Sequence, residues 1–422
     1  MPGADGMATS GPGAPTGQRI KRGVFVMTAS RIAQRVLGLL RFVVLTHWLS
    51  PADVGLVVVG VLAIDTLNML TVTGLASAFI QRKDAAADCL DAVWTLQLTR
   101  ALGLVVLAAL VAPVVGFALE EPGVVPLIRA LALMLLINGL SSGAAMMLRR
   151  DLDFGPLGIA QTLGAVADVI VTLWLVSVTH SPWAMVAGQL TQSLINAIAS
   201  YIIHPYRPRL DFAWGKLRGL WRTGAWMGAS HMLLFASRRA DDLLVTALAG
   251  HAALAVYQPA FRLANLPGTE GTDVLAGVFF PAYSRLQADP ARVRALRGRV
   301  LRFTALLTLP FAAALIVAGP WATTVLFGPE WLSMGTLLQI LAVQGAIQAL
   351  GETARPILFA AGKPRAYAAL KSLHVGVFVL LGVPLVYFHG AIGAALATTA
   401  ASLLIAPLML WYAYRIATKP KA

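Results

Sequence analysis

Long hydrophobic runs separated by short polar connections repeat along the chain from residue 23 onward. Twelve of these runs are long enough to cross about 30 Å of hydrocarbon as helices. They lie at 23–47, 54–80, 92–117, 125–148, 156–178, 183–203, 220–248, 253–282, 301–320, 331–359, 365–387 and 391–414. The pattern therefore predicts an all-α integral membrane protein of about twelve transmembrane helices.

The connections between these runs alternate in charge. Every second connection, beginning with WLSPAD, contains neither Lys nor Arg, and the connections between them are basic. Loops rich in Lys and Arg stay on the cytoplasmic side of a membrane. We therefore expect both termini to be cytoplasmic, together with the basic loops QRKDAAADCLD, RRDLDFG, HPYRPRLDFAWGKLRGLWR, SRLQADPARVRALRGRVLR and AGKPRA.

The two halves of the chain resemble each other at an offset of about 200 residues, where 44–55 aligns with 244–255. Chance similarity between apolar segments is the alternative explanation. A true parallel repeat of six helices would give two lobes around an axis along the membrane normal. The expected organisation is a disordered tail at 1–18, an N-lobe at 19–203, a basic linker at 204–222, a C-lobe at 223–415 and a cytoplasmic tail at 416–422.

Composition agrees with a membrane protein and narrows its chemistry. The 422 residues are 58% hydrophobic and 12% charged, against about 25% charged in soluble domains. The net charge of +14 is mostly in the basic loops and tails, so topology explains it and nucleic-acid binding is not expected. The single cysteine, Cys89, allows no intrachain disulfide, and the seven histidines show no zinc-site spacing, so we expect no metal.

Seventeen charged residues fall inside the predicted helices, where a central charge costs about 2.5–3.5 kcal/mol on the insertion scale. They require a polar interior. Ten are cations and seven are anions: Arg31, Arg35, Arg41, Arg100, Arg129, Arg238, Arg239, Arg262, Arg355 and Lys371, with Asp65, Asp168, Asp241, Asp242, Glu270, Asp273 and Glu352.

The cations divide by their local partners. Arg31, Arg100 and Arg129 lie near helix ends, and we expect them to extend to the membrane interface. Arg238 and Arg239 have Asp241 and Asp242 one turn away and can pair with them. The cations with fewer local partners are Arg41, Arg262, Arg355 and Lys371.

These six residues, Arg41, Arg262, Arg355, Lys371, Arg238 and Arg239, are the candidate substrate-binding residues of a central, cation-lined cavity between the lobes. A phosphate or diphosphate group would suit such a cavity, because guanidinium groups form charge-assisted, bidentate bonds to phosphate oxygens.

Five carboxylates are candidates for ion or proton coupling, namely Asp65, Asp168, Glu270, Asp273 and Glu352. Intramembrane carboxylates often carry such coupling, and structural pairing with a cation is the alternative for each. We expect no cofactor. The chain has no HExxH, no P-loop sequence and no long outer loop, which favours a transporter over an enzyme.

Several segments resemble the polysaccharide-biosynthesis flippases of the multidrug/oligosaccharidyl-lipid/polysaccharide (MOP) exporter superfamily. They are LSPADVGLVVVG, GLASAFIQRKD, LRRDLDF, RADDLLVTALAGHAALAVYQPAFRLANLP, FFPAYSRLQAD and LFGPEWLSMGTLLQILA. The resemblance covers about residues 20 to 415. It carries Asp242, Gly250, Tyr257, Arg262 and Pro281 onto family positions, and departs at Ala255, where the family usually has glycine.

The resemblance implies two helical lobes around a central cavity that works by alternating access in the bacterial inner membrane. The implied substrate is an undecaprenyl-diphosphate-linked oligosaccharide, moved between leaflets and driven by H⁺, Na⁺ or the membrane potential. Membrane lipid and, in some pathways, polysaccharide polymerase or export machinery are the implied partners. The glycan, the coupling ion and the oligomeric state stay open.

Three other functions remain alternatives. A drug antiporter of the same superfamily would be expected to have a net acidic, aromatic site, whereas this chain has more cations than anions in its helices. The others are a non-transporting scaffold for glycan assembly and an integral-membrane glycan polymerase.

Overall fold

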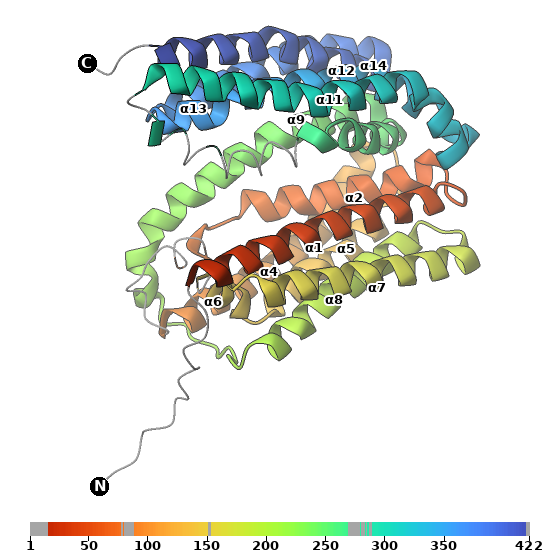
Figure 1. Ribbon diagram of the computed structural model, residues 1–422. Coiled ribbons are helices and arrows are strands. Elements are labelled where there is room, and N and C mark those ends of the chain that lie inside the picture. The colour runs from red at the N-terminus through yellow and green to blue at the C-terminus, as the bar shows by residue number, and fades with distance from the viewer. Residues whose placement is uncertain are drawn as a thin grey trace.

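The first half of the chain forms six long helices and one short helix in a computed structural model (Figure 1). The structure describes residues 16–76, 79, 88–150, 153–268, 279, 283, 285, 286 and 289–418. The helices are α1 (Thr16–Leu45), α2 (Pro51–Leu70), α4 (Asp88–Ala118), α5 (Val124–Leu140), α6 (Ala144–Arg150), α7 (Gly155–Thr179) and α8 (Trp183–Ile203).

The elements of the second half are also all helices in the part that the structure describes. Its elements are η1 (Trp214–Leu217), α9 (Arg218–Ala264), α11 (Pro290–Phe327), η2 (Pro329–Trp331), α12 (Leu332–Glu352), α13 (Ala354–Ala360) and α14 (Pro364–Thr418).

Two of these elements are hairpins of two helical arms. Gly250 in α9 (φ 84°) and Gly390 in α14 (φ 57°) have backbone angles that glycine adopts readily and that end a helical run. Tyr257 bonds Asp241 and Gln258 bonds Asp242, which is possible only if the arms of α9 run antiparallel. Counting each arm separately, the described part contains twelve long helical segments, as the hydrophobic pattern predicts.

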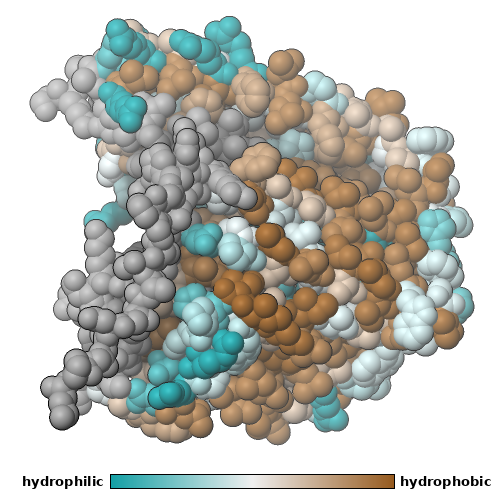
Figure 2. Space-filling view, turned by 60° about the horizontal axis from the view of Figure 1, so that its bottom comes forward, coloured by the Kyte–Doolittle hydropathy of each residue, from teal (hydrophilic) through white to brown (hydrophobic). Residues whose placement is uncertain are grey.

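The outer surface of these helices suits a lipid environment. Within the residues that the structure describes, seven helices are long and apolar enough to cross a membrane, when each hairpin is counted once. Large hydrophobic side chains such as Leu110, Val114, Ile170 and Trp174 are exposed, and Figure 2 shows hydrophobic residues covering much of one face, with hydrophilic ones towards its edges. The all-α membrane fold expected from the sequence is therefore confirmed.

The same helix pairings occur in both halves. In the first half α1 packs against α7, α2 against α5, α4 against α5, and α5 and α7 against α8. In the second half α9 packs against α14 and α12, and α12 packs against α11 and α14.

The two halves form two layers in Figure 1, with α2 and α9 in contact between them. The boundaries of the lobes remain predictions.

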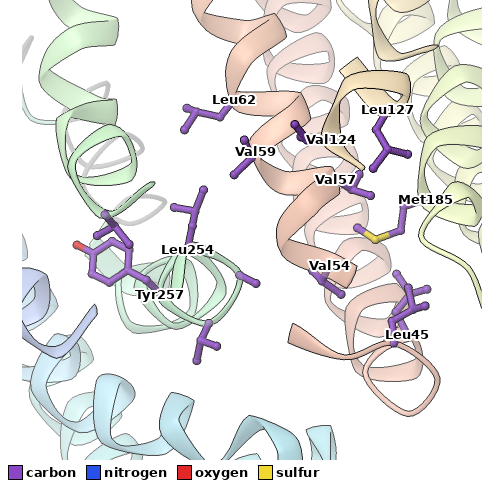
Figure 3. Packing of buried hydrophobic residues seen from close by; sticks show 14 of the residues in the cluster. Leu45, Val54, Val57, Val59, Leu62, Val124, Leu127, Met185, Leu254 and Tyr257 are labelled. Atoms are coloured by element: carbon purple, nitrogen blue, oxygen red, sulfur yellow. The ribbon is translucent and has the colours of Figure 1, made fainter. Parts of the chain in front are cut away.

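The hydrophobic core is shared at one end of the molecule and divided at the other. Near the connections that lack Lys and Arg, one cluster contains Leu45 and Val54 of the first half together with Leu254, Tyr257 and Trp331 of the second (Figure 3). Near the basic connections, the cluster around Leu75 and the cluster around Ile357 are separate. The halves therefore share one core at the end predicted to face outward, while at the other end the start of α9 touches the first half at Gly224 and Gly74.

Close contacts reinforce this joined end, which we call the outer contact. A Cβ atom added to Gly55 of α2 would lie 2.4 Å from the backbone oxygen of His251, so only glycine fits here. The ring of Phe42 lies 5.5 Å from that of Phe327 and 5.2 Å from that of Trp331.

At the opposite end, residues 204–213 are extended along α4. The amide of Arg209 donates to Asp91 (3.1 Å), and the amide of Asp211 donates to the Thr95 hydroxyl (2.9 Å). The Tyr206 hydroxyl also donates to Asp91, and burial and this carboxylate raise the pKa of Tyr206. The start of the predicted linker is thus fixed to the first half.

Candidate functional site

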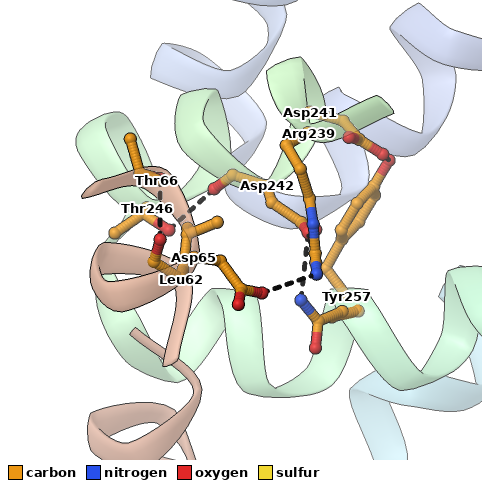
Figure 4. A network of polar contacts seen from close by, with 9 residues as sticks. Leu62, Asp65, Thr66, Arg239, Asp241, Asp242, Thr246 and Tyr257 are labelled. Carbon is orange, nitrogen blue, oxygen red and sulfur yellow. Dashed lines mark hydrogen bonds and ion pairs between the residues drawn. The ribbon is translucent and has the colours of Figure 1, made fainter. Parts of the chain in front are cut away.

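An ion-pair network joins α2 to the first arm of α9 (Figure 4). The Arg239 guanidinium lies 2.6 Å from the Asp242 carboxylate on the same helix and 3.2 Å from Asp65 Oδ2 on α2. Arg239 therefore connects carboxylates from both halves of the chain. The side chains of Asp65 and Arg239 are 41% and 23% exposed, whereas Asp242 is buried.

The turn at Gly250 brings the second arm of α9 against these charges. Gln258 Nε2 donates to Asp242 Oδ2 (3.0 Å), and the Tyr257 hydroxyl donates to Asp241 Oδ2 (3.2 Å). Tyr257 is completely buried. The hairpin thus holds both carboxylates by side chains of the opposite arm.

Arg262 lies one turn beyond Gln258 on the second arm, and its side chain is exposed. The charges that act on it are those of Arg239, Asp242, Asp65 and Arg41, so it belongs to the same cluster. Among the residues that the structure describes, it has no hydrogen-bond or ion-pair partner. Within the described part of the chain, Arg262 is thus a cation that can accept an external anion without first breaking a bond.

A second charged site lies inside the first half. Arg41 Nη1 of α1 donates to Asp168 Oδ1 (2.6 Å) and Oδ2 (2.5 Å) of α7, and the Thr172 hydroxyl donates to Oδ1 (3.1 Å). Asp168 is buried, and a Cβ atom on Gly188 of α8 would lie 2.3 Å from its Oδ1. The pair therefore fastens α1 to α7 beneath α8.

A third charged site lies inside the second half, at the end near the basic connections. Lys371 of α14 forms an ion pair with Glu352 at the end of α12, and the Tyr367 hydroxyl donates to Glu352 (2.9 Å). Arg355 of α13 lies beside Tyr367. This site is well separated along the chain and in its contacts from the network around Arg239.

In the structure, the candidate residues are distributed over three charged sites. The sequence had placed them together along one cavity. Arg41 and Lys371 are paired with carboxylates distant in sequence, which local spacing did not reveal. Arg239 pairs with Asp242 as the spacing predicts, while Arg238 is exposed on α9. Asp65, Asp168 and Glu352 each contact a cation. Glu270, Asp273 and Pro281 lie outside the described residues.

Arg100 contacts the end of α2, and its reach to the membrane interface stays a prediction. Its guanidinium donates to the Asn68 backbone oxygen (3.1 Å), the Asn68 side-chain oxygen (2.9 Å) and the Thr71 hydroxyl (3.1 Å) at the end of α2. A cation stabilises a helix C-terminus, where backbone carbonyls lack partners.

Sequence reasoning missed the uncharged members of these sites. Gln258 was not singled out, although it bonds Asp242. Asn265 Nδ2 donates to Gln344 Oε1 (2.9 Å) between α9 and α12, and both side chains are buried. A Gln or Asn side chain within a long apolar run was the signal that could have identified them. Such a buried polar group must be hydrogen-bonded, so it indicates a partner nearby.

The cluster around Arg239 and Arg262 is suited to binding an anion. No group of three or more metal-ligating side chains occurs in the described residues. The guanidinium of Arg262 offers donors in a planar fork that matches phosphate oxygens. Because the cluster lies where the two halves meet, an anion bound there would contact both of them.

Comparisons with known proteins identify the family of the chain and its fold. The sequence pattern of a family described as polysaccharide biosynthesis protein matches residues 44–336. The lipopolysaccharide biosynthesis protein WzxC of Escherichia coli strain K12 is 26% identical over 391 residues, which cover 91% of this chain and 78% of the relative.

Two solved structures share the fold. The lipid II flippase MurJ, in an inward closed conformation, has a TM-score of 0.72 and 16% identity, covering 93% of this chain and 87% of that one. An inward-facing multidrug resistance MATE family transporter of the MOP superfamily has a TM-score of 0.68 and 15% identity, covering 91% and 94%.

Proposed function

The chain belongs to the polysaccharide biosynthesis protein family, and we propose that it is a flippase for an undecaprenyl-diphosphate-linked oligosaccharide repeat unit. It moves this substrate from the cytoplasmic to the periplasmic leaflet of the bacterial inner membrane. It is a transporter and not an enzyme, and both termini are cytoplasmic. Membrane lipid surrounds it, and polymerase or export machinery receives its product.

The observation that carries this proposal is the exposed guanidinium of Arg262 between the two halves, which has no ion-pair partner among the described residues. A diphosphate linker is an anion with oxygens suited to bidentate binding. The shared core at the outer contact and the exposed side chain of Arg262 support a state in which the outer end is closed. Alternating access then requires the outer contact to open.

A drug antiporter of the same fold is the main competing function. Its cationic substrates would be repelled by Arg262, which has no ion-pair partner among the described residues, and this favours an anionic substrate here. A non-transporting scaffold would need no unpaired cation between the halves.

Reconstituted vesicles test this proposal. The purified protein, added to liposomes containing fluorescent undecaprenyl-diphosphate oligosaccharide, is expected to move label between leaflets. Arg262→Ala should slow this movement about tenfold or more, because hydrogen bonds to charged groups contribute about 1.5–3 kcal/mol. Arg262→Lys should retain part of the rate, since it keeps the charge but loses the fork.

The matched control is Arg129→Ala, which removes an exposed arginine of α5 outside this cluster. It should leave the rate unchanged. No movement of label by the wild-type protein would refute the flippase proposal, and equal rates for Arg262→Ala and wild type would remove Arg262 from the binding site.

A further inference from the structure

Helix α11 carries a row of arginines at its N-terminal end and contains no acidic residue. The arginines are Arg292, Arg294, Arg297, Arg299 and Arg302. From Pro290 to the C-terminus the sequence has two acidic residues, Glu330 and Glu352. Glu352 already pairs with Lys371, and Glu330 lies beyond the opposite end of α11. Neither of them can neutralise the arginines.

Two of these arginines, Arg299 and Arg302, form an exposed pair on the lipid-facing side of the helix. Both side chains are exposed, and among the residues that the structure describes they have no hydrogen-bond or ion-pair partner. Residues three or four positions apart share a helix face, so the pair lies on the same face as the exposed Phe303 and Leu306. The charges therefore continue a surface that contacts lipid.

The exposed apolar residues of α11 indicate the depth of this pair in the membrane. They run from Phe303 to Leu326, a rise of about 35 Å at about 1.5 Å per residue. This length matches about 30 Å of hydrocarbon crossed by a tilted helix. Arg302 therefore lies at the boundary of the hydrocarbon, and Arg299 lies about 4.5 Å beyond it. Both are within the headgroup layer, which is about 5–8 Å thick on each side.

The other exposed arginines of the row lie too far from the hydrocarbon to reach the same layer. Arg294 is about 12 Å and Arg292 about 15 Å beyond Arg302 along the helix. Arg292 also forms an ion pair with Asp289 (3.1 Å). These two residues are therefore a natural control for the pair at headgroup depth.

Aromatic residues of α14 indicate the same depth independently. In the second layer α11 packs against α14 (Figure 1), where Trp411 and Tyr414 are exposed. Exposed Trp and Tyr side chains favour the membrane interface. The Arg297 guanidinium lies 5.1 Å from the centre of the Tyr414 ring. The interface therefore crosses α11 beside Arg299.

The two guanidinium groups lie at nearly the same level. A Cβ atom added to Gly298 would lie 3.8 Å from Arg302 Nη2, and no atom of another element lies within 4 Å of it. The Arg302 side chain thus folds back along the helix towards Arg299, over a position that has no side chain. This arrangement leaves room for one phosphate between two planar donors.

The first half has no equivalent pair. Helix α4, the third long segment of the first half as α11 is of the second, begins with Asp88 and also carries Asp91. Its one basic residue is Arg100, whose guanidinium bonds the end of α2. The exposed basic pair is therefore a feature of the second half.

We propose that Arg299 and Arg302 bind the phosphate of an anionic phospholipid, in the leaflet on the side of the basic connections. Guanidinium groups form charge-assisted, bidentate bonds to phosphate oxygens, and basic residues at a membrane surface attract anionic headgroups. A zwitterionic headgroup carries its own cation, so an anionic headgroup is favoured. The bound lipid supplies the countercharge that α11 lacks. The site does not involve Arg262 and is independent of the proposed transport function.

Photoreactive phosphatidylglycerol in liposomes of phosphatidylcholine tests this site. Label is expected on segment 295–306 of the wild-type protein, and unlabelled phosphatidylglycerol should compete with it. Arg299→Gln combined with Arg302→Gln should weaken this competition about 5- to 30-fold, since each basic residue near the surface is worth about fivefold in binding.

The matched control combines Arg292→Gln with Arg294→Gln, which removes the same charge from the same helix beyond the headgroup layer. It should stay close to wild type. Equal weakening in both double variants would show a diffuse attraction to the basic end of α11 and would overturn the proposal. Unchanged competition in the Arg299 and Arg302 variant would overturn it as well.

Thermal unfolding of the purified protein in detergent checks the fold of the variants and the source of the phosphate. Without added lipid, the wild type and both double variants should unfold at the same temperature. Phosphatidylglycerol should stabilise the wild type and the control but not the Arg299 and Arg302 variant, because a ligand of the folded state raises its stability. Equal stabilisation by inorganic phosphate would indicate a site for a soluble anion and overturn the proposal. So would loss of undecaprenyl-diphosphate binding in that variant while phosphatidylglycerol binding is retained.

Discussion

The charged pair inside the first half and the charged network between the halves use the same residue types in different ways. Arg41 and Asp168 form a one-to-one pair with two short contacts, and Asp168 is buried. Arg239 is shared between Asp65 and Asp242, and its contact with Asp65 is longer and more exposed. The pair of Arg41 and Asp168 fixes helices within one half. The ion pairs of Arg239 can be replaced by others when an anion binds or the halves separate.

The largest effect that tests this difference is expected at Asp168. Asp168→Ala leaves the Arg41 guanidinium without its partner and should lower the free energy of unfolding by about 3–5 kcal/mol. The double variant Arg41→Met with Asp168→Leu should be much closer to wild type, because it removes both charges together. Thermal and detergent-induced unfolding of the purified protein would measure both.

A similar stability for Asp168→Ala and the double variant would contradict a structural role for the pair. Asp168 would then have to be uncharged in the folded protein. Asp168 would then again be a candidate for ion or proton coupling. The Arg41–Asp168 pair could no longer be described as more structural than the network around Arg239.

The next effect concerns the outer contact. Gly55→Ala places a Cβ atom 2.4 Å from the His251 backbone oxygen, and relieving such overpacking costs about 1–3 kcal/mol. The strain exists only while the halves are joined, so the population with a separated outer contact should rise about 5- to 150-fold. Gly103→Ala, where nothing lies within 4 Å of an added Cβ atom, is the matched control.

Cysteine accessibility on the outer surface would measure this shift, with Cys89→Ala as the background. An unchanged accessibility in Gly55→Ala would mean that α2 and the turn of α9 move together. The outer contact would then not be the part of the molecule that opens.

The elements of this fold could largely be predicted from the sequence, because lipid requires long apolar helices with internally satisfied backbones. The run at 54–80 shows the limit. Helix α2 ends at Leu70, and Gly74 adopts φ 63° where an added Cβ would lie 2.2 Å from the Gly224 backbone oxygen. The break is caused by a contact with a segment far along the chain. The apolar pattern of the run therefore continues through it and does not reveal it.

The candidate site was predictable in residue type but not in pairing. The spacing of Arg239 and Asp242 fits one helical turn, and the structure contains that pair. The partners of Arg41 and Lys371 lie on other helices, so no local pattern reveals them. Asp241 appears from the sequence to neutralise the arginines before it, and only the turn at Gly250, which brings Tyr257 to it, shows otherwise.

The smallest effect is expected at Asp65, and it tests whether the network between the halves is exchangeable. Asp65→Asn removes the ion pair of Arg239 to the first half. Since this pair is partly exposed, its loss should favour the separated state by only about 0.2–1 kcal/mol, or up to about fivefold. Spin labels at positions 120 and 330, on exposed residues of opposite halves near the outer contact, would report the distance distribution in a Cys89→Ala background. Substrate should produce the same change in the wild-type protein, because a diphosphate bound at Arg262 competes with Asp65 for Arg239. A substrate-induced change of equal size in Asp65→Asn and wild type would show that this ion pair takes no part in the response.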